Sequence, residues 1–416
     1  MNDKHLHLTN NISITQRFFT ILLPFCGGYF LSYLFRSTNA VIAPKLIVEI
    51  GADAEQLGML TSSYLLTFAI FQIPLGILLD KYGPRNVQIY LMIIASIGAL
   101  LFALGDDIIV LTIARGIIGL GVAGCLMSTF KIITLWYKKI HWPVLYGLCL
   151  SSGGLGAIAA TKPLDLTVET IGWRGAFFIL SISCIFVALT IWLITPEKRT
   201  PLSKQNTLYV LRQIYSSKLF WKIAPLAGIS GGTGLAIQGL WAGEWLRDVA
   251  NLNQIETTNM LLILNLSLLI GMIATGFIPN LLKRTGLSQL DIYFFITLIL
   301  LLGHSFLTFE IIPQSSLPWI LIGVSASSGI LAYSWLNAQF PISYAGRTST
   351  AINLSLFICG FILQYAVGYI INLWDRTPDG SYPSEAYSIA FVILLGLQVI
   401  CIGIFLSVKI DLNDKT

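Results

Sequence analysis

Apolar residues form twelve long blocks along the chain, and short polar or charged turns separate the blocks. Each block is about 18–26 residues long, which at a rise of roughly 1.5 Å per residue matches a hydrocarbon layer about 30 Å thick. The pattern therefore predicts an all-α polytopic membrane protein with twelve transmembrane helices. The expected spans are 18–43, 55–80, 86–104, 108–135, 142–165, 173–194, 221–246, 257–282, 289–310, 317–340, 348–373 and 386–407.

The composition and the placement of charge agree with this topology. Apolar residues make up 55% of the 416 and charged residues 11%, whereas a soluble domain carries about 25% charged residues. The net charge of +5 comes from loops on one side of the expected membrane, so it does not indicate a nucleic-acid partner. The other side carries only these basic residues: Lys45, Lys162, Arg174, Arg247 and Arg376. The positive-inside rule therefore predicts cytoplasmic N- and C-termini, and the short loops favour a bacterial inner (plasma) membrane.

The twelve blocks fall into two groups of six. We expect a cytoplasmic tail, an N-terminal six-helix bundle, a cytoplasmic linker, a C-terminal six-helix bundle and a second cytoplasmic tail. Their ranges are 1–17, 18–194, 195–220, 221–407 and 408–416. A weak internal repeat supports this division, because residues 76–85 and 276–286 each combine glycine, Asp or Asn, and basic residues after a span.

Three motifs resemble signatures of the major facilitator superfamily (MFS), and the resemblance covers essentially the whole chain. The loop between spans two and three matches the family pattern at Gly76, Asp80, Lys81, Gly83 and Arg85. Residues 111–121 of span four, which include Arg115, match a second signature, and residues 172–177 resemble the usual entry into span six. The resemblance implies the MFS fold, with two bundles that rock about a midplane substrate site.

The resemblance also implies a gating role for the loop, which in the family locks the bundles together on the cytoplasmic side. We therefore interpret the following as gating or conformational residues: Gly76, Asp80, Lys81, Gly83, Arg85 and Arg115. Asp80 ends a helix, where the helix dipole disfavours an anion, so another group such as Arg85 should hold it. Span five departs from the family's drug–proton antiporters, because residues 151–156 lack their Gly-Pro pair.

Three basic residues fall inside the expected spans and away from their first and last four residues: Arg36, Arg115 and Lys131. A charge near the bilayer centre costs at least about 2.5–3.5 kcal/mol on insertion scales, so each needs a partner or a watery cavity. The nearest acidic residues lie at the predicted outer ends of spans: Asp165, Glu244 and Glu310. This cationic interior favours an anionic or zwitterionic solute. We interpret Lys131 as reaching the lipid headgroups, because it lies near the cytoplasmic end of its span.

One face of span one is expected to bind the solute. Tyr29, Tyr33 and Arg36 follow one another at i, i+4 and i+7, and a guanidinium can bind a carboxylate or phosphate through two hydrogen bonds. The alternative is that Arg36 extends to the outer interface. Further expected substrate contacts are polar residues in spans seven, ten and eleven: Gln238, Tyr333, Asn337, Asn353 and Gln364. Their alternative role is hydrogen bonding between helices. The glycine-rich run 228–234 predicts a break in span seven.

The sequence predicts a secondary transporter that moves a small organic solute by alternating access. The candidate classes are a carboxylate, an organophosphate, a carboxylate siderophore and an amino acid. Glu244 is the one candidate for proton coupling, and symport, uniport and exchange all remain open. No motif indicates an enzyme, ATP, a cofactor or a metal, so the expected partners are the solute and membrane lipids, and the expected functional unit is a monomer. The alternatives are a multidrug/proton antiporter and a transporter-like solute sensor.

Overall fold

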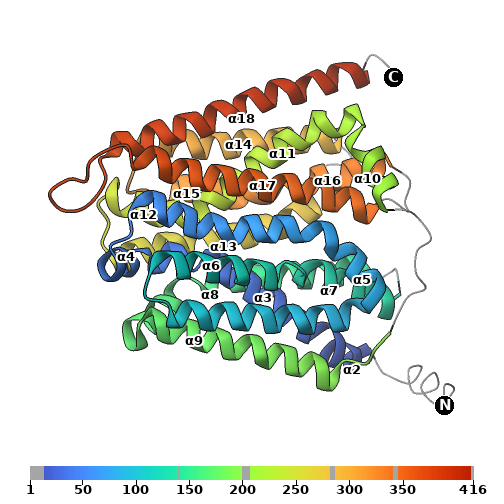
Figure 1. Ribbon diagram of the computed structural model, residues 1–416. Helices are drawn as coiled ribbons and strands as arrows, with labels where there is room; N and C mark the ends of the chain where they lie inside the picture. The colour runs from blue at the N-terminus through green and yellow to red at the C-terminus, as the bar shows by residue number, and fades with distance from the viewer. Residues whose placement is uncertain (1–13, 139–140, 199–206, 282–285, 341–344, 414–416) are drawn as a thin grey trace.

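The computed structural model describes residues 14–138, 141–198, 207–281, 286–340 and 345–413, and each regular element within these ranges is helical. The helices run roughly parallel to one long axis (Figure 1). They form the two six-helix bundles that the hydropathy pattern predicts.

The N-terminal bundle contains spans one to six. Its elements are α2 (Ile14–Arg17), η1 (Phe18–Leu22), α3 (Leu23–Ser37), α4 (Asn39–Ile50), α5 (Ala54–Leu104), α6 (Ile108–Val122), α7 (Cys125–Trp136), α8 (Trp142–Ala159) and α9 (Lys162–Ile194). Span one consists of α2, the π-helical turn η1 and α3, whereas α6 and α7 together form span four.

The C-terminal bundle contains spans seven to twelve and follows the linker helix α10. The elements from the linker onward are α10 (Thr207–Tyr215), α11 (Lys218–Ala236), η3 (Ile237–Trp241), α12 (Ala242–Asp248), α13 (Gln254–Leu281), α14 (Gln289–Thr308), α15 (Leu317–Ser325), η5 (Ala326–Ser328), α16 (Gly329–Ala338), α17 (Ala345–Ile371) and α18 (Ser384–Asn413). Span seven consists of α11, the π-helical turn η3 and α12.

Two glycines with left-handed backbone angles interrupt helices that are otherwise continuous. Gly83 (φ 78°) separates spans two and three within α5, and Gly172 (φ 75°) precedes span six within α9. A residue with a Cβ is strained in this region, which explains why glycine occupies both turns. Span six therefore begins at Trp173, as the sequence predicts.

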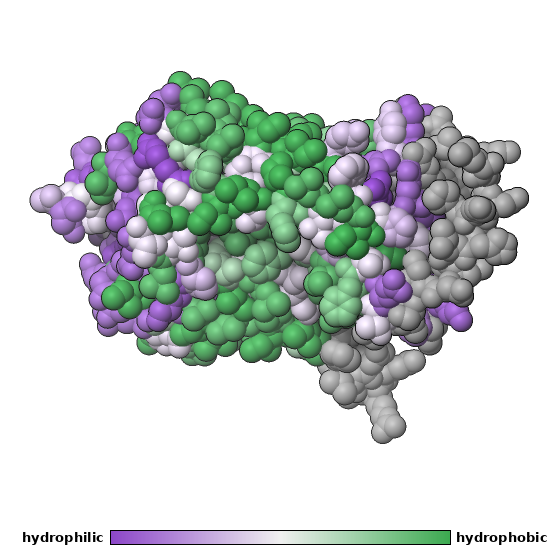
Figure 2. All heavy atoms as spheres, turned by 90° about the horizontal axis from the view of Figure 1, so that it is seen from below, coloured by the Kyte–Doolittle hydropathy of each residue, from purple (hydrophilic) through white to green (hydrophobic). Residues whose placement is uncertain are grey.

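Length and hydropathy confirm the membrane-spanning character of the helices. Ten of the described helices are long and apolar enough to cross a membrane, and two shorter apolar helices, Leu145–Ala159 and Leu317–Ala332, lie where spans five and ten were expected. Apolar side chains form a broad band around the middle of the molecule, and hydrophilic side chains gather towards its ends (Figure 2).

The two ends of the molecule are packed differently. We call the end that carries α10, the start of α2 and the end of α18 the linker end (Figure 1). One cluster of buried side chains joins the bundles: in the N-terminal bundle it extends from Phe35 to Trp136 near the linker end, whereas its members in the C-terminal bundle, such as Trp241, lie in the middle and the remote half. At the linker end the C-terminal bundle has its own cluster around Phe220 and Phe405, and α5 contributes to another around Leu79. Among the described residues, the C-terminal bundle therefore joins this shared cluster through its middle and the half remote from the linker, and has a separate cluster at the linker end.

The predicted break at residues 228–234 of span seven is wrong. Helix α11 continues through this run. The glycines permit close contact with α17, since a Cβ on Gly232 would lie 2.7 Å from the backbone nitrogen of Gly360. The irregularity comes directly afterwards, in the π-helical turn η3. Small residues at helix crossings are a general device of membrane proteins.

We predict that Gly156→Ala destabilises the protein by about 1–3 kcal/mol, the usual range for overpacking a tight contact. A Cβ at Gly156 would overlap the carbonyl oxygen of Phe30, so α8 could no longer approach α3 as closely. The matched control is Gly147→Ala in the same helix, where no neighbouring atom lies within 4 Å of the added Cβ. Thermal unfolding in detergent should show a lower Tm for the first variant alone; equal Tm values would contradict the packing argument.

Candidate functional site

A cavity of about 930 Å³ lies between the two bundles. Spans one, two, four and five form one wall, and the equivalent spans of the second bundle, seven, eight, ten and eleven, form the other. Leu211 and Tyr215 of α10 also line the cavity, so it extends to the linker end.

The opposite end is closed by direct contacts between the bundles. Gly243 of α12 packs against the carbonyl of Ala40 in α4 with no room for a Cβ. Side-chain hydrogen bonds also join the bundles here: Gln254 to Asp165 (2.7 Å), Thr258 to Asp165 (3.0 Å), Tyr365 to Glu55 (2.6 Å), Arg376 to the carbonyl of Ala52 (2.9 Å), and the Ala54 amide to the Tyr382 hydroxyl (3.2 Å). We call this the closed end.

The cavity wall is positively charged. Its basic side chains are Arg36 of α3, Lys131 of α7 and Arg347 of α17, and among the described residues no Asp or Glu lines the cavity. Arg36 lies towards the closed end of span one, whereas Lys131 and Arg347 lie nearer the linker end of their helices. A negatively charged solute would therefore meet favourable potential along the cavity.

Aromatic rings surround the guanidinium group of Arg36. Its side chain is 7% exposed, and its guanidinium carbon lies 4.3 Å from the ring centre of Tyr33, 5.2 Å from that of Phe357 and 5.7 Å from that of Phe68. The Nε atom of Arg36 is buried and donates to no described group. Arg36 therefore belongs to the cavity wall and does not extend to the outer interface.

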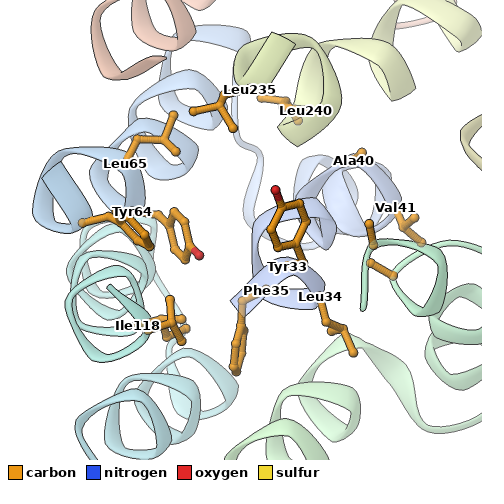
Figure 3. Packing of buried hydrophobic residues seen from close by; sticks show 14 of the residues in the cluster. Tyr33, Leu34, Phe35, Ala40, Val41, Tyr64, Leu65, Ile118, Leu235 and Leu240 are labelled. Carbon is orange, nitrogen blue, oxygen red and sulfur yellow. The ribbon is translucent and has the colours of Figure 1, made fainter. Parts of the chain in front are cut away.

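The predicted tyrosine face of span one also lines the cavity. The rings of Tyr29 and Tyr33 meet edge to face, with centroids 5.1 Å apart. Gly153 of α8 makes room for both rings, because a Cβ there would lie 2.6 Å from Tyr29 and 2.9 Å from Tyr33. Figure 3 shows the Tyr33 ring between its own bundle and the part of span seven that carries Leu235.

Two of the polar residues predicted to contact substrate in the C-terminal bundle reach the cavity. Gln238 and Asn353 line it, and the Gln238 amide donates to Asn265 at 2.6 Å. Gln364 does not, because it is fully buried and its amide links α17 to span seven, accepting from the Trp241 indole (2.8 Å) and donating to the Ala236 carbonyl (3.1 Å). The side chains of Tyr333 and Asn337 fall outside the described residues.

Arg115 connects helices within the N-terminal bundle. It is fully buried, donates to the carbonyl of Phe35 at 3.0 Å and lies 5.2 Å from the ring centre of Tyr64. It does not line the cavity. The Phe35 carbonyl is near the junction of α3 and α4, so Arg115 stabilises the region of span one that presents Arg36.

The loop signature lies at the linker end and contacts its own bundle. Arg85 donates to the carbonyl oxygens of Thr195 (2.6 Å) and Trp192 at the end of α9. Gly76 lines the cavity, and no atom of another described helix lies within 4 Å of the position of a Cβ there, so no described helix packs against Gly76 in this conformation. Lys81 is exposed and stacks on Tyr82, with its ammonium 5.1 Å from the ring centre. The Asp80 side chain falls outside the described residues.

Glu244 lies at the closed end, away from the cavity wall. It is 5% exposed and forms an ion pair with Arg247, one helical turn further along α12. Its neighbour Gly243 is in contact with the other bundle. The structure therefore does not bring Glu244 to the predicted substrate-binding residues.

Sequence reasoning missed several residues of the cavity. It placed Lys131 at the headgroups and assigned no site role to Arg347, yet both line the cavity. It also assigned no role to Phe68 or Gln72 of span two. The internal repeat of six spans could have helped to find them. Spans two and five line the cavity, as their counterparts in the second half, spans eight and eleven, also do. For metals, no group of three His, Cys, Asp or Glu side chains among the residues described could hold an ion.

Comparisons with known proteins bear on these observations. Residues 25–364 match the sequence profile of the Major Facilitator Superfamily. The probable sulfoacetate transporter SauU of Cupriavidus necator is 32% identical over 161 residues, which cover 38% of this chain and 37% of that protein, little more than a third of its length. A probable L-galactonate transporter of Escherichia coli (strain K12) is 22% identical over 371 residues, covering 82% of this chain and 80% of that protein.

The fold has close structural counterparts. A bacterial homologue of the human lysosomal transporter Spinster, in its inward-facing and unoccupied conformation, superposes with a TM-score of 0.73 at 18% identity, over 94% of this chain and 97% of that one. The family match, the related transporters and the apolar helices identify a multi-pass membrane protein that is a solute transporter and not an enzyme. The chain belongs to the Major Facilitator Superfamily.

Proposed function

We propose that this protein is a secondary transporter that carries a small organic anion across the membrane by alternating access. The observation that carries the proposal is the charge of the central cavity, where three basic side chains and no described acidic side chain form the wall. A zwitterionic solute with an exposed carboxylate would also fit this wall.

The cost of burying charge supports an anionic ligand. A cation inside a span is unfavourable by at least about 2.5–3.5 kcal/mol on insertion scales. Arg36 has no carboxylate partner among the described residues, so its compensation comes from aromatic rings and, in our proposal, from the substrate. An anion bound through two hydrogen bonds would provide the strongest of these interactions.

The residues around Arg36 define the proposed binding site. We assign the anionic group of the substrate to Arg36, and hydrogen bonds to its remaining polar atoms to Tyr29, Tyr33, Gln238 and Asn353, all of which line the cavity. Gln364 is left out of this site, because its amide is occupied between helices. Substrate contact by Tyr333 and Asn337 stays a prediction.

The related proteins support the anionic class. SauU is named for sulfoacetate and the E. coli relative for L-galactonate, and both compounds are organic anions. These names do not select one compound for this chain, since the two relatives differ in substrate and the match to SauU covers 37% of that protein.

Topology supports an inward-open conformation. The basic loops predict that the linker end is cytoplasmic, in a bacterial inner membrane. The cavity extends to α10 at that end, while hydrogen bonds join the bundles at the other. Gly76 then lies at the open mouth, and we infer that the C-terminal bundle approaches this position when the mouth closes.

The experiment that tests the proposed function is a thermal-shift screen of the purified protein against organic anions, amino acids and cationic drugs, followed by counterflow in proteoliposomes. A ligand at a hundredfold excess over Kd stabilises by about 2.7 kcal/mol, so binding should be visible. Stabilisation by anions or carboxylate zwitterions with counterflow supports the proposal. Stabilisation by cationic drugs alone would favour export, and binding without counterflow would favour a sensor.

We predict that Arg36→Gln weakens binding of the stabilising anion by roughly 10- to 100-fold, because a hydrogen-bonded charge contact is worth about 1.5–3 kcal/mol. Arg36→Lys should retain part of the affinity, since it keeps the charge and loses the paired hydrogen bonds. The matched control is Arg174→Gln, which removes the same group outside the cavity. Titration by thermal shift or calorimetry measures the effect, and unchanged affinity in Arg36→Gln would refute the assignment.

We predict that Gly76→Leu leaves anion binding unchanged and slows transport at least several-fold. The open mouth has space for the side chain, but closure of the linker end would trap it between the bundles. Gly147→Leu is the control, because that glycine also has no neighbour within 4 Å of a Cβ and does not line the cavity. Proteoliposome uptake with parallel binding measurements tests this, and normal uptake by Gly76→Leu would exclude closure at this position.

A further inference from the structure

We propose that Phe68 and Phe357 form an aromatic clamp between the bundles, that Arg36 holds the clamp shut, and that an anion bound to Arg36 releases it. The inference rests on the proposed function, because it takes the bound solute to be an anion. It goes further by naming the contact through which a bound solute would change the conformation of the closed end.

The two rings belong to opposite bundles and lie in direct contact. Phe68 of α5 and Phe357 of α17 stack with centroids 4.0 Å apart and ring planes 19° from parallel. They are 5% and 3% exposed, and both line the cavity. A stacked pair of this kind contributes attraction beyond the apolar area that it buries.

The clamp lies where contact between α5 and α17 ends. Towards the closed end the helices touch: a Cβ on Gly58 would lie 3.2 Å from the carbonyl of Gln364, and one on Gly360 would lie 3.3 Å from Leu65. Beyond Phe68, in the other direction, Gln72 and Gly76 line the cavity. The Phe68–Phe357 stack is therefore the boundary between the closed end and the solute space.

Arg36 contacts both rings at once. Its guanidinium carbon lies 5.7 Å from the ring centre of Phe68 and 5.2 Å from that of Phe357, within the range of cation–π attraction. This attraction depends on the full positive charge of the guanidinium. An anion that pairs with Arg36 neutralises that charge and draws the side chain towards the cavity, so the rings and the anion compete for one group.

The competition couples binding to conformation. In the empty protein the charge of Arg36 favours the stacked rings and hence the closed end. In the occupied protein the stack loses this contribution, so the population shifts towards separation of the bundles at that end. A ligand changes such an equilibrium only through a difference in its interactions with the two states, and loss of the Arg36–ring contact supplies that difference.

The test measures the closed end in the ligand-free protein, so that no substrate needs to be known. Spin labels on Asp106→Cys and Ile311→Cys, one on each bundle and both at exposed positions of the closed end, report its opening as a distance distribution. The variants are Phe357→Leu, Phe68→Leu and Arg36→Gln, the last of which removes the charge as a bound anion would. Phe357→Tyr keeps the ring and serves as the conservative variant.

The chain provides a matched control. Phe102 and Phe177 stack at 4.1 Å with planes 26° apart, but both belong to the N-terminal bundle. Phe102→Leu therefore removes the same kind of contact without touching the interface between the bundles. It should lower stability and leave the distance distribution unchanged.

We expect the three clamp variants to raise the ratio of open to closed populations by roughly 3- to 30-fold, the range that the loss of one or two cation–π contacts implies. Phe357→Tyr and Phe102→Leu should match the wild type. If Phe357→Leu does not fold, Phe68→Leu tests the same contact from the other bundle. A distribution identical to wild type in either Phe68→Leu or Arg36→Gln would overturn the clamp.

The two proposals can fail separately. If Arg36→Gln loses anion binding but keeps the wild-type distance distribution, the anion site stands and the clamp is wrong. If Arg36→Gln opens the closed end but binds anions normally, the clamp contact stands as a structural feature, and both the anion assignment and the release by anion are wrong.

Discussion

A buried guanidinium without a carboxylate partner among the described residues constrains the centre of this structure. Arg36 lies in the wall of a membrane-embedded cavity, where an uncompensated charge is costly. The aromatic rings around it lower that cost but do not neutralise the charge. Each conformation of the protein must therefore give Arg36 access to water or to an anion. This requirement relates the open cavity, the lack of described acidic side chains in its wall and the organic anions of the relatives.

The fold could be predicted from sequence because its determinants are local. The length of each apolar block fixes a span, and the glycines at the turns fix where helices end: Gly83 and Gly172 adopt backbone angles that other residues avoid. The loop signature and span-four motif then selected the family, which the sequence profile confirms. The break in span seven was misplaced because a glycine run looks flexible in isolation, whereas here it is packed against α17.

The site was harder to predict, because it depends on which face each helix presents. Tyr29, Tyr33 and Arg36 share a face of a regular helix, and all three line the cavity; their contact with substrate stays a prediction. In span seven Gln238 lies within the π-helical turn η3 and lines the cavity, whereas Glu244 lies nearer the closed end, pairs with Arg247 and does not line it. Contacts between bundles, such as Phe68 with Phe357, leave no trace in the periodicity of either helix.

The volume of the cavity has a consequence for the solvent. About 930 Å³ is at the upper end of the usual range for small-molecule sites, so a small organic anion would share the space with water molecules on the order of tens. A cycle that closes the linker end must expel most of that water. The balance between the two conformations is thereby tied to the activity of water, and osmolytes too large to enter the cavity would favour its closure.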